Sequence, residues 1–242
     1  MKKMRFLAIC VIAVLATMNV KAQFAVGTDI VSSYVWRGIS QGTTHGGTPN
    51  FQPTLSFTTG GLTIGSWGSG SFDGEIKEVD LYASYVFSPS FAITLTDYNY
   101  GFAQPKGYFY YGKGTDHLYE ATLAYTGPKT FPLGIAVNTM FAGSDTLSNG
   151  KAAFSTYAEL NYPITDNVKV FCGASVLKSN ANVYNTSGFA ITNIGIKVSK
   201  SIVITDKFSL PLYGILGANL SNKYYDGTTK PTSLYFVAGI TL

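Results

Sequence analysis

The sequence alternates apolar and polar residues with a period of two in many short stretches, and this pattern limits the folds open to the chain. In residues 77–87, Val79 and Leu81 fall on one face, while Glu78 and Asp80 fall on the other. Successive side chains of a strand point to opposite faces, so the pattern predicts a sheet with one apolar and one polar face. In a soluble β-sandwich the apolar face forms a core, whereas in an outer-membrane barrel it faces lipid.

The first residues have the features of an export signal. Basic residues near the start are followed by an apolar run over residues 6–18, and the small side chains of Val20 and Ala22 suit the positions before a cleavage site. We therefore expect a signal peptide over residues 1–22, cleaved after Ala22, and one mature domain over residues 23–242.

The charge content favours a membrane protein over a nucleic-acid binder. Without the four basic residues of the signal, the 17 basic residues become 13, which equals the 13 acidic ones. A neutral mature chain does not indicate a nucleic-acid partner. Charged residues make up 12% of the chain and aromatic residues 14%, and a soluble domain needs more surface charge than that. No apolar run of about 18 residues follows the signal, so helical spans are not expected.

The alternation predicts an all-β chain, an antiparallel transmembrane β-barrel of about 12 strands. Most predicted strands are close to the length that a tilted strand needs to cross the hydrocarbon layer. The predicted strands cover residues 24–38, 49–59, 62–70, 77–87, 91–101, 116–126, 132–142, 151–162, 168–177, 188–204, 208–220 and 232–242.

Short and long connections alternate along the chain. The short ones lie at residues 60–61, 88–90, 127–130, 163–167 and 205–207, and the long ones at residues 39–48, 71–76, 102–115, 143–150, 178–187 and 221–231. Bacterial outer-membrane barrels have short periplasmic turns and longer outer loops. The alternation therefore predicts a barrel with both termini in the periplasm, and a soluble sandwich gives no reason for it.

Aromatic residues gather near the ends of the predicted strands, as in the interfacial girdles of membrane barrels. These residues are Tyr34, Trp36, Tyr85, Phe87, Tyr98, Tyr100, Tyr125, Tyr162, Tyr224 and Tyr225. Cys172 is the only cysteine after residue 22, so we expect no disulfide within the mature domain.

The sequence contains no clear catalytic or metal-binding pattern. His45 and His117 are the only histidines, and neither Ser144 nor Ser148 lies in a nucleophile motif. Two distant histidines and one cysteine do not form a ligand cluster. We expect no enzymatic activity, no cofactor and no bound metal.

If the chain is a barrel, function lies on the face that carries the polar residues. The predicted pore-lining residues are Glu78, Asp80, Tyr82, Asp116, Glu120, Tyr157, Glu159, Lys169 and Lys197, with Asn193, Tyr213 and Asn219 on the same face. If the lysines pair with acids, the lumen is partly plugged; if water hydrates them, it conducts. Acids outnumber bases on this face, which predicts a mild preference for cations.

One long loop, over residues 102–115, is rich in aromatic residues. Tyr108, Tyr110 and Tyr111 lie between glycines. They could fold inward as a loop constriction or offer stacking faces to a solute, or the loop could rest outside on the aromatic girdle.

Four segments resemble those of a known family. These are Ser-Ser-Tyr-Val-Trp-Arg-Gly-Ile-Ser-Gln at residues 32–41, the glycine-rich stretch at residues 61–69, the acidic strand start at residues 78–82 and Tyr98-Asn99-Tyr100. They are similar to the TorF-type porin family of exported bacterial proteins. The resemblance implies an outer-membrane barrel with channel function and brings no catalytic or substrate residues. Within the first segment, Arg37 belongs in a lumen or at a rim rather than in lipid.

Together these features predict a bacterial outer-membrane porin that lets small hydrophilic solutes diffuse passively. Its expected partners are outer-membrane lipid and the barrel-assembly machinery, with no nucleic acid. Two alternatives remain open: a non-conducting barrel with surface-binding loops, and a soluble periplasmic β-sandwich or lipocalin-like binder.

Overall fold

The structure, a computed structural model, describes residues 22–42, 47–100, 107–112, 114–176, 183, 184, 186, 188–221 and 234–242. In these ranges every regular element is a strand, and none of the described residues forms a helix long and apolar enough to cross a membrane. The expected signal peptide up to residue 21, His45, Tyr224 and Tyr225 lie outside the described residues.

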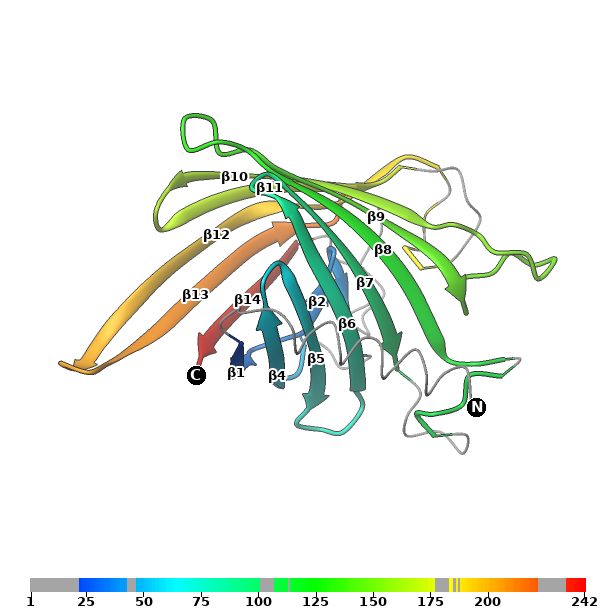
Figure 1. The fold of residues 1–242 in the computed structure, drawn as a ribbon, viewed down its shortest axis with the longest axis horizontal. Coiled ribbons are helices and arrows are strands. Elements are labelled where there is room, and N and C mark those ends of the chain that lie inside the picture. The colour runs from blue at the N-terminus through cyan, green and yellow to red at the C-terminus, as the bar shows by residue number, and fades with distance from the viewer. Residues whose placement is uncertain are drawn as a thin grey trace.

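The long strands form one closed antiparallel barrel of 12 strands (Figure 1). They are β1 (Gln23–Val31), β4 (Asn50–Thr59), β5 (Leu62–Ser71), β6 (Lys77–Ser88), β7 (Phe91–Asn99), β8 (His117–Thr126), β9 (Gly134–Gly143), β10 (Thr156–Thr165), β11 (Val168–Ser175), β12 (Ala190–Thr205), β13 (Phe208–Ala218) and β14 (Leu234–Thr241). Each pairs with its neighbours in chain order, and β1 closes the ring by pairing with both β4 and β14. The short strands β2 (Val35–Trp36) and β3 (Ile39–Ser40) form a separate two-stranded sheet.

The period-two pattern gives the barrel an apolar outside and a polar inside. Leu160 on the outer face of β10 is 49% exposed, whereas Glu78 on the inner face of β6 is only 2% exposed. A sandwich or a lipocalin-like binder would have its apolar residues inside. The sandwich alternative is wrong, because the sheet closes on itself and its polar side chains lie within. The architecture is compatible with an outer-membrane barrel.

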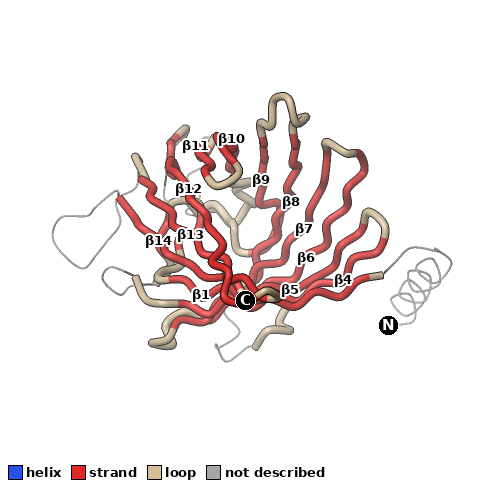
Figure 2. Tube along the Cα trace, turned by 90° about the vertical axis from the view of Figure 1, so that its left-hand side faces the viewer, coloured by secondary structure: helices blue, strands red, loops and turns tan. Residues whose placement is uncertain are grey.

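Short connections gather at one end of the barrel and long ones at the other. The turns at residues 60–61, 89–90, 127–133, 166–167 and 206–207 lie at the end that we call the turn end. The opposite, loop end carries the long connections. Figure 2 views the molecule from the left-hand side of Figure 1, where the β12–β13 turn lies. The predicted alternation of short and long connections holds with one exception, because the turn at residues 127–133 is longer than the loop at residues 72–76.

Two predicted strands differ from the structure. The strand expected over residues 24–38 ends at Val31, and the residues that follow leave the wall. The strand expected over residues 151–162 begins only at Thr156, because Phe154 has a φ of 53° and Asp145 accepts bonds from the Ser155 amide and hydroxyl, both at 2.8 Å. A positive φ in a residue other than glycine interrupts a strand.

The β12–β13 hairpin is longer than its neighbours and projects beyond them at the turn end (Figure 1). β11 pairs with β12 only as far as Val198, and β14 pairs with β13 only from Leu212 onward. Residues 199–211 therefore form a two-stranded ribbon whose strands pair only with each other over most of its length.

Candidate functional site

The lumen contains a hairpin made by the segment that follows β1. β2 and β3 pair through Val35 with Ser40 and Trp36 with Ile39, and the two residues between them, Arg37 and Gly38, have φ values of 51° and 80°. Two successive positive φ values are those of the tight hairpin turn that favours glycine. We call residues 32–41 the lumenal hairpin.

Glycine is required at the tip of the lumenal hairpin for a second reason. A Cβ atom at Gly38 would lie 1.7 Å from the backbone oxygen of Thr192 on β12, so the two backbones approach more closely than any other residue allows. The side-chain amide of Asn219, just after β13, donates to the Gly38 carbonyl oxygen at 3.0 Å. The tip is therefore seated against the β12–β13 wall at the loop end.

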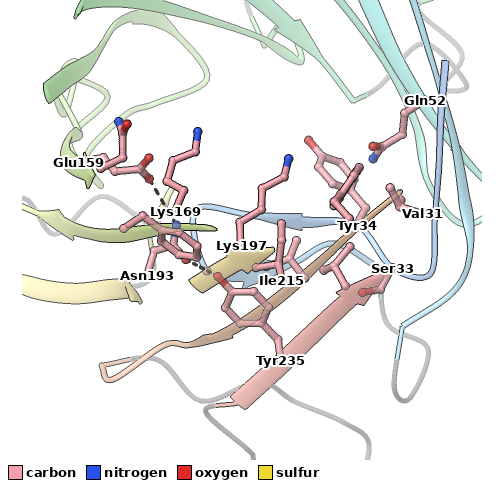
Figure 3. Close-up of a pocket in the computed structure, with 16 residues that line it drawn as sticks. Val31, Ser33, Tyr34, Gln52, Glu159, Lys169, Asn193, Lys197, Ile215 and Tyr235 are labelled. Atoms are coloured by element: carbon pink, nitrogen blue, oxygen red, sulfur yellow. Dashed lines mark hydrogen bonds between the residues drawn. The ribbon is translucent and has the colours of Figure 1, made fainter. Parts of the chain in front are cut away.

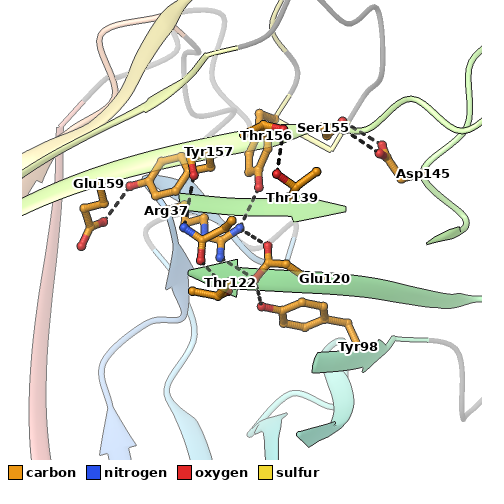
Figure 4. Close-up of polar contacts among 12 residues, drawn as sticks. Arg37, Tyr98, Glu120, Thr122, Thr139, Asp145, Ser155, Thr156, Tyr157 and Glu159 are labelled. Atoms are coloured by element: carbon orange, nitrogen blue, oxygen red, sulfur yellow. Dashed lines mark hydrogen bonds and ion pairs between the residues drawn. The ribbon is translucent and has the colours of Figure 1, made fainter. Parts of the chain in front are cut away.

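Arg37 extends from the hairpin to Glu120 on β8. Its Nη1 and Nη2 donate to the two carboxylate oxygens at 2.5 and 2.8 Å, and Nη1 also donates to the Tyr184 hydroxyl at 2.7 Å. Glu120, which is 1% exposed, accepts a further bond from the Tyr98 hydroxyl at 3.0 Å (Figure 4). A two-bonded arginine–carboxylate pair is a strong and directional contact, so it joins the hairpin to the barrel wall.

Aromatic rings enclose the Arg37 guanidinium. Its Cζ lies 4.5 Å from the ring centroid of Trp36 and 4.9 Å from that of Tyr157, distances that favour cation–π attraction. Trp36 in turn stacks on Tyr184 with centroids 5.5 Å apart and planes 14° apart. We call Arg37, Glu120, Trp36, Tyr98, Tyr157 and Tyr184 the arginine cluster.

Burial and charge act in opposite directions on this cluster. Burial by itself lowers the pKa of Arg37, but Tyr184 and Glu120 outweigh it and hold that pKa well above its ordinary value. Burial is also the largest cause that raises the pKa of Tyr184 to about 12. At neutral pH the guanidinium is therefore charged and Tyr184 is a neutral phenol that accepts its bond.

Between the lumenal hairpin and the turn end lies a cavity of about 310 Å³, which we call the chamber. Its wall comes from the hairpin, β1, β4 and the strands β10 to β14 (Figure 3). The polar side chains that line it are those of Ser33, Tyr34, Gln52, Glu159, Asn161, Lys169, Asn193, Lys197, Tyr213 and Tyr235. The lumen is thus divided into a packed arginine cluster and an open chamber.

The predicted pore-lining residues fall into different parts of the barrel. Arg37, Glu120 and Tyr157 belong to the arginine cluster, whereas Glu159, Lys169 and Lys197 line the chamber. Glu78 and Asp80 are buried on the inner face of β6. Tyr82 is half-buried, with its ring over Gly65, where a Cβ would lie 2.5 Å from it. Asp116 precedes β8, is exposed and does not line the chamber.

The aromatic loop lies on the outer face near the loop end. The ring of Tyr111 stacks on His117 with centroids 4.3 Å apart, and the ring of Tyr108 meets the same imidazole edge-on at 5.2 Å. Side chains along β8 alternate between its two faces, and Glu120 points inward. His117 and Tyr119, whose rings stack, therefore lie on the outer face. The described part of the loop, which includes Tyr110, therefore contacts the outside of the barrel, and its rings do not cross the lumen as a constriction.

The imidazole of His117 is held by Asp97, Asn99 and the backbone of Tyr108 rather than by a serine. Its Nδ1 lies 2.6 Å from the Asp97 carboxylate, and its Nε2 lies 2.8 Å from the Asn99 amide and 2.6 Å from the Tyr108 carbonyl oxygen. Among the described residues there is no group of histidine, cysteine, aspartate and glutamate that could hold a metal. The absence of catalysis and of a cofactor remains a prediction.

Sequence reasoning missed the lumenal hairpin and its partners. Tyr34 and Trp36, expected in an aromatic girdle, lie in the lumen, where Tyr34 packs on Trp67 and Trp36 on Tyr98. The available signal was Arg37-Gly38, a pair suited to a tight turn inside a predicted strand that was longer than most of the others. Tyr184 gave no signal, because it lies in a loop far away in the sequence.

The chain is thus a closed, 12-stranded antiparallel β-barrel with a polar lumen that a hairpin partly fills. No known protein family matches this chain in a comparison with family models, and no curated protein matches it either.

Proposed function

We propose that this protein is a bacterial outer-membrane porin through which small hydrophilic solutes diffuse passively. The observation that carries the proposal is the chamber of about 310 Å³, lined by polar and charged side chains inside a barrel with an apolar exterior. In a membrane barrel the exterior faces lipid and the interior is water-accessible. The resemblance of residues 32–41 to the TorF-type porin family leads to the same proposal.

In this proposal the lumenal hairpin is the selective element. It narrows the lumen at the loop end, so solutes pass between the hairpin and the wall. The mechanism is exclusion by size together with electrostatic filtering by the inward charges, without turnover. Export through a signal peptide cleaved near Ala22 and insertion by the barrel-assembly machinery belong to the same proposal.

Planar-bilayer recordings of the refolded protein test the proposal. We expect small unitary currents from the wild type and larger currents from Arg37→Ala, because the hairpin loses its bridge to Glu120. Lys200→Ala is the matched control, because Lys200 is an exposed residue of β12 outside the chamber lining. Its currents should equal those of the wild type.

The contacts of Arg37 favour a second candidate, a non-conducting barrel whose outer loops bind a surface partner. The bridge between Arg37 and Glu120 crosses the lumen and packs its loop end with aromatic rings. If neither the wild type nor Arg37→Ala carries current after correct refolding, this second function replaces the porin proposal.

A further inference from the structure

Two lysines lie side by side on the wall of the chamber. Lys169 of β11 and Lys197 of β12 are direct cross-strand partners, and both line the chamber. Figure 3 shows both side chains extending in the same direction into the open space that Tyr34 and Gln52 border on another side. Like charges directly opposite each other destabilise a sheet, so this placement is unfavourable unless something binds between them.

Two carboxylates in the surroundings of this pair, those of Glu159 and Asp29, are held by neutral donors. Glu159 accepts a bond from the Tyr157 hydroxyl at 2.7 Å and one from the Asn193 amide at 3.4 Å. Asp29 on β1 accepts a bond from the Tyr213 hydroxyl at 3.1 Å. These hydrogen bonds leave both carboxylates charged, and Asp29 still attracts Lys197 electrostatically, but no ion pair joins either acid to a lysine.

Neither lysine takes part in an ion pair within the described part of the chain, where the ion pairs join Arg37 to Glu120 and His117 to Asp97. The Nζ of Lys197 lies 4.0 Å from the centroid of the Tyr213 ring. A cation–π contact orients an ammonium group without neutralising it. The two positive charges are therefore directed at the chamber and remain available to an anion.

The rest of the chamber wall contains apolar side chains. These are Val31, Val35, Phe171, Ile215 and Val237. Sites for small molecules typically combine an apolar wall with a few polar groups that fix orientation.

We propose that the chamber binds a small organic carboxylate, with its charged group between Lys169 and Lys197 and its apolar body against the neighbouring wall. The inference rests on the proposed function and names the solute class of the same lumen. It also reverses the cation preference predicted from the count of inward acids. That count treated all charges alike, whereas Glu120 is neutralised by Arg37, Glu159 and Asp29 are held by tyrosine hydroxyls, and the two lysines stand side by side on the chamber wall.

Isothermal titration of the full-length barrel, refolded in detergent at low salt, tests the inference with three probes of one shape: benzoate, benzamide and benzamidinium. We expect the wild type to bind benzoate in preference to the neutral and cationic probes. The double variant Lys169→Gln/Lys197→Gln should weaken benzoate binding about tenfold or more, because both charge-assisted contacts are lost. Lys200→Gln removes the same charge from β12 outside the chamber lining and should leave binding unchanged.

Three results would overturn the inference: no binding of benzoate by the wild type, equal binding of benzoate and benzamide, or unchanged benzoate binding in the double variant. Circular dichroism and heat-dependent gel migration show whether the double variant is folded. If it is not folded, benzoate binding by the single variants Lys169→Gln and Lys197→Gln tests the inference instead. Bilayer currents are a separate measurement. A barrel that conducts but ignores benzoate overturns only this inference, whereas one that binds benzoate without conducting overturns the porin proposal.

Discussion

The two halves of the lumen differ in whether their inward charges are paired. At the loop end, Arg37 and Glu120 neutralise each other and are surrounded by aromatic rings. Toward the turn end, Lys169 and Lys197 lie side by side on the wall of the chamber, and neither forms an ion pair within the described residues. The inward face is therefore not one uniform charged surface: in one region opposite charges hold the structure together, and in the other like charges line a cavity.

The largest change in the free energy of unfolding is expected when the arginine cluster loses its cation. Arg37→Met removes one partner of a buried pair and leaves the Glu120 carboxylate uncompensated, so the free energy of unfolding should fall by about 3–5 kcal/mol. Urea unfolding of the barrel in lipid vesicles measures it. Arg37→Met/Glu120→Leu should recover much of the loss, and a double variant as unstable as the single one would contradict the pairing.

A smaller loss is expected when the hairpin tip is pushed off the wall. Gly38→Ala places a Cβ against the Thr192 backbone oxygen. Gly74→Ala is a matched control, because Gly74 has a φ of 79° but no atom within 4 Å of such a Cβ. Both variants carry the same backbone strain, so the extra loss at Gly38, about 1–3 kcal/mol in the same unfolding assay, measures the close approach alone. Equal losses would show that the tip is not seated as described.

The Tyr184 hydroxyl should contribute less. Tyr184→Phe removes one bond to Arg37 but keeps the stacking on Trp36 and the two bonds to Glu120. We expect a loss of about 1 kcal/mol in the free energy of unfolding. Tyr184→Ala, which also removes the stacking, should lose clearly more, and an equal loss in both variants would leave the ring without a role.

The smallest effect should have the opposite sign. Lys169→Gln relieves the repulsion with Lys197 and should raise the free energy of unfolding by about 0.2–1 kcal/mol at low salt. Because salt screens charges in a hydrated lumen, the gain should shrink at high ionic strength. A loss of stability at low salt would mean that Lys169 has a stabilising partner and that the two halves of the lumen do not differ.

The barrel itself was predictable because its wall strands repeat a strict two-residue alternation. β6 and β14 begin and end within two residues of the predicted bounds. The first predicted strand ran too long because the lumenal hairpin that follows β1 is also extended. Periodicity identifies an extended backbone but does not say whether both of its faces lie inside the barrel.

The candidate site was predictable only residue by residue. The pattern indicated that Glu120, Glu159 and Lys197 face inward, and they do. It could not pair Arg37 with Glu120, or Lys169 with Lys197, because such pairs depend on the register of strands and on where a hairpin tip rests. Counting the inward charges therefore predicted a preference for cations without taking into account the groups that each charge contacts.

Because the β12–β13 hairpin projects beyond the barrel, the two ends of β12 should differ in local stability. Near Ile194, β12 is bonded on both sides by the barrel wall, whereas from Ser201 onward it has β13 as its only partner. An isolated two-stranded ribbon is marginally stable in water. Along this single strand, the backbone amides of residues 201–205 should therefore exchange their hydrogens long before those of residues 191–198.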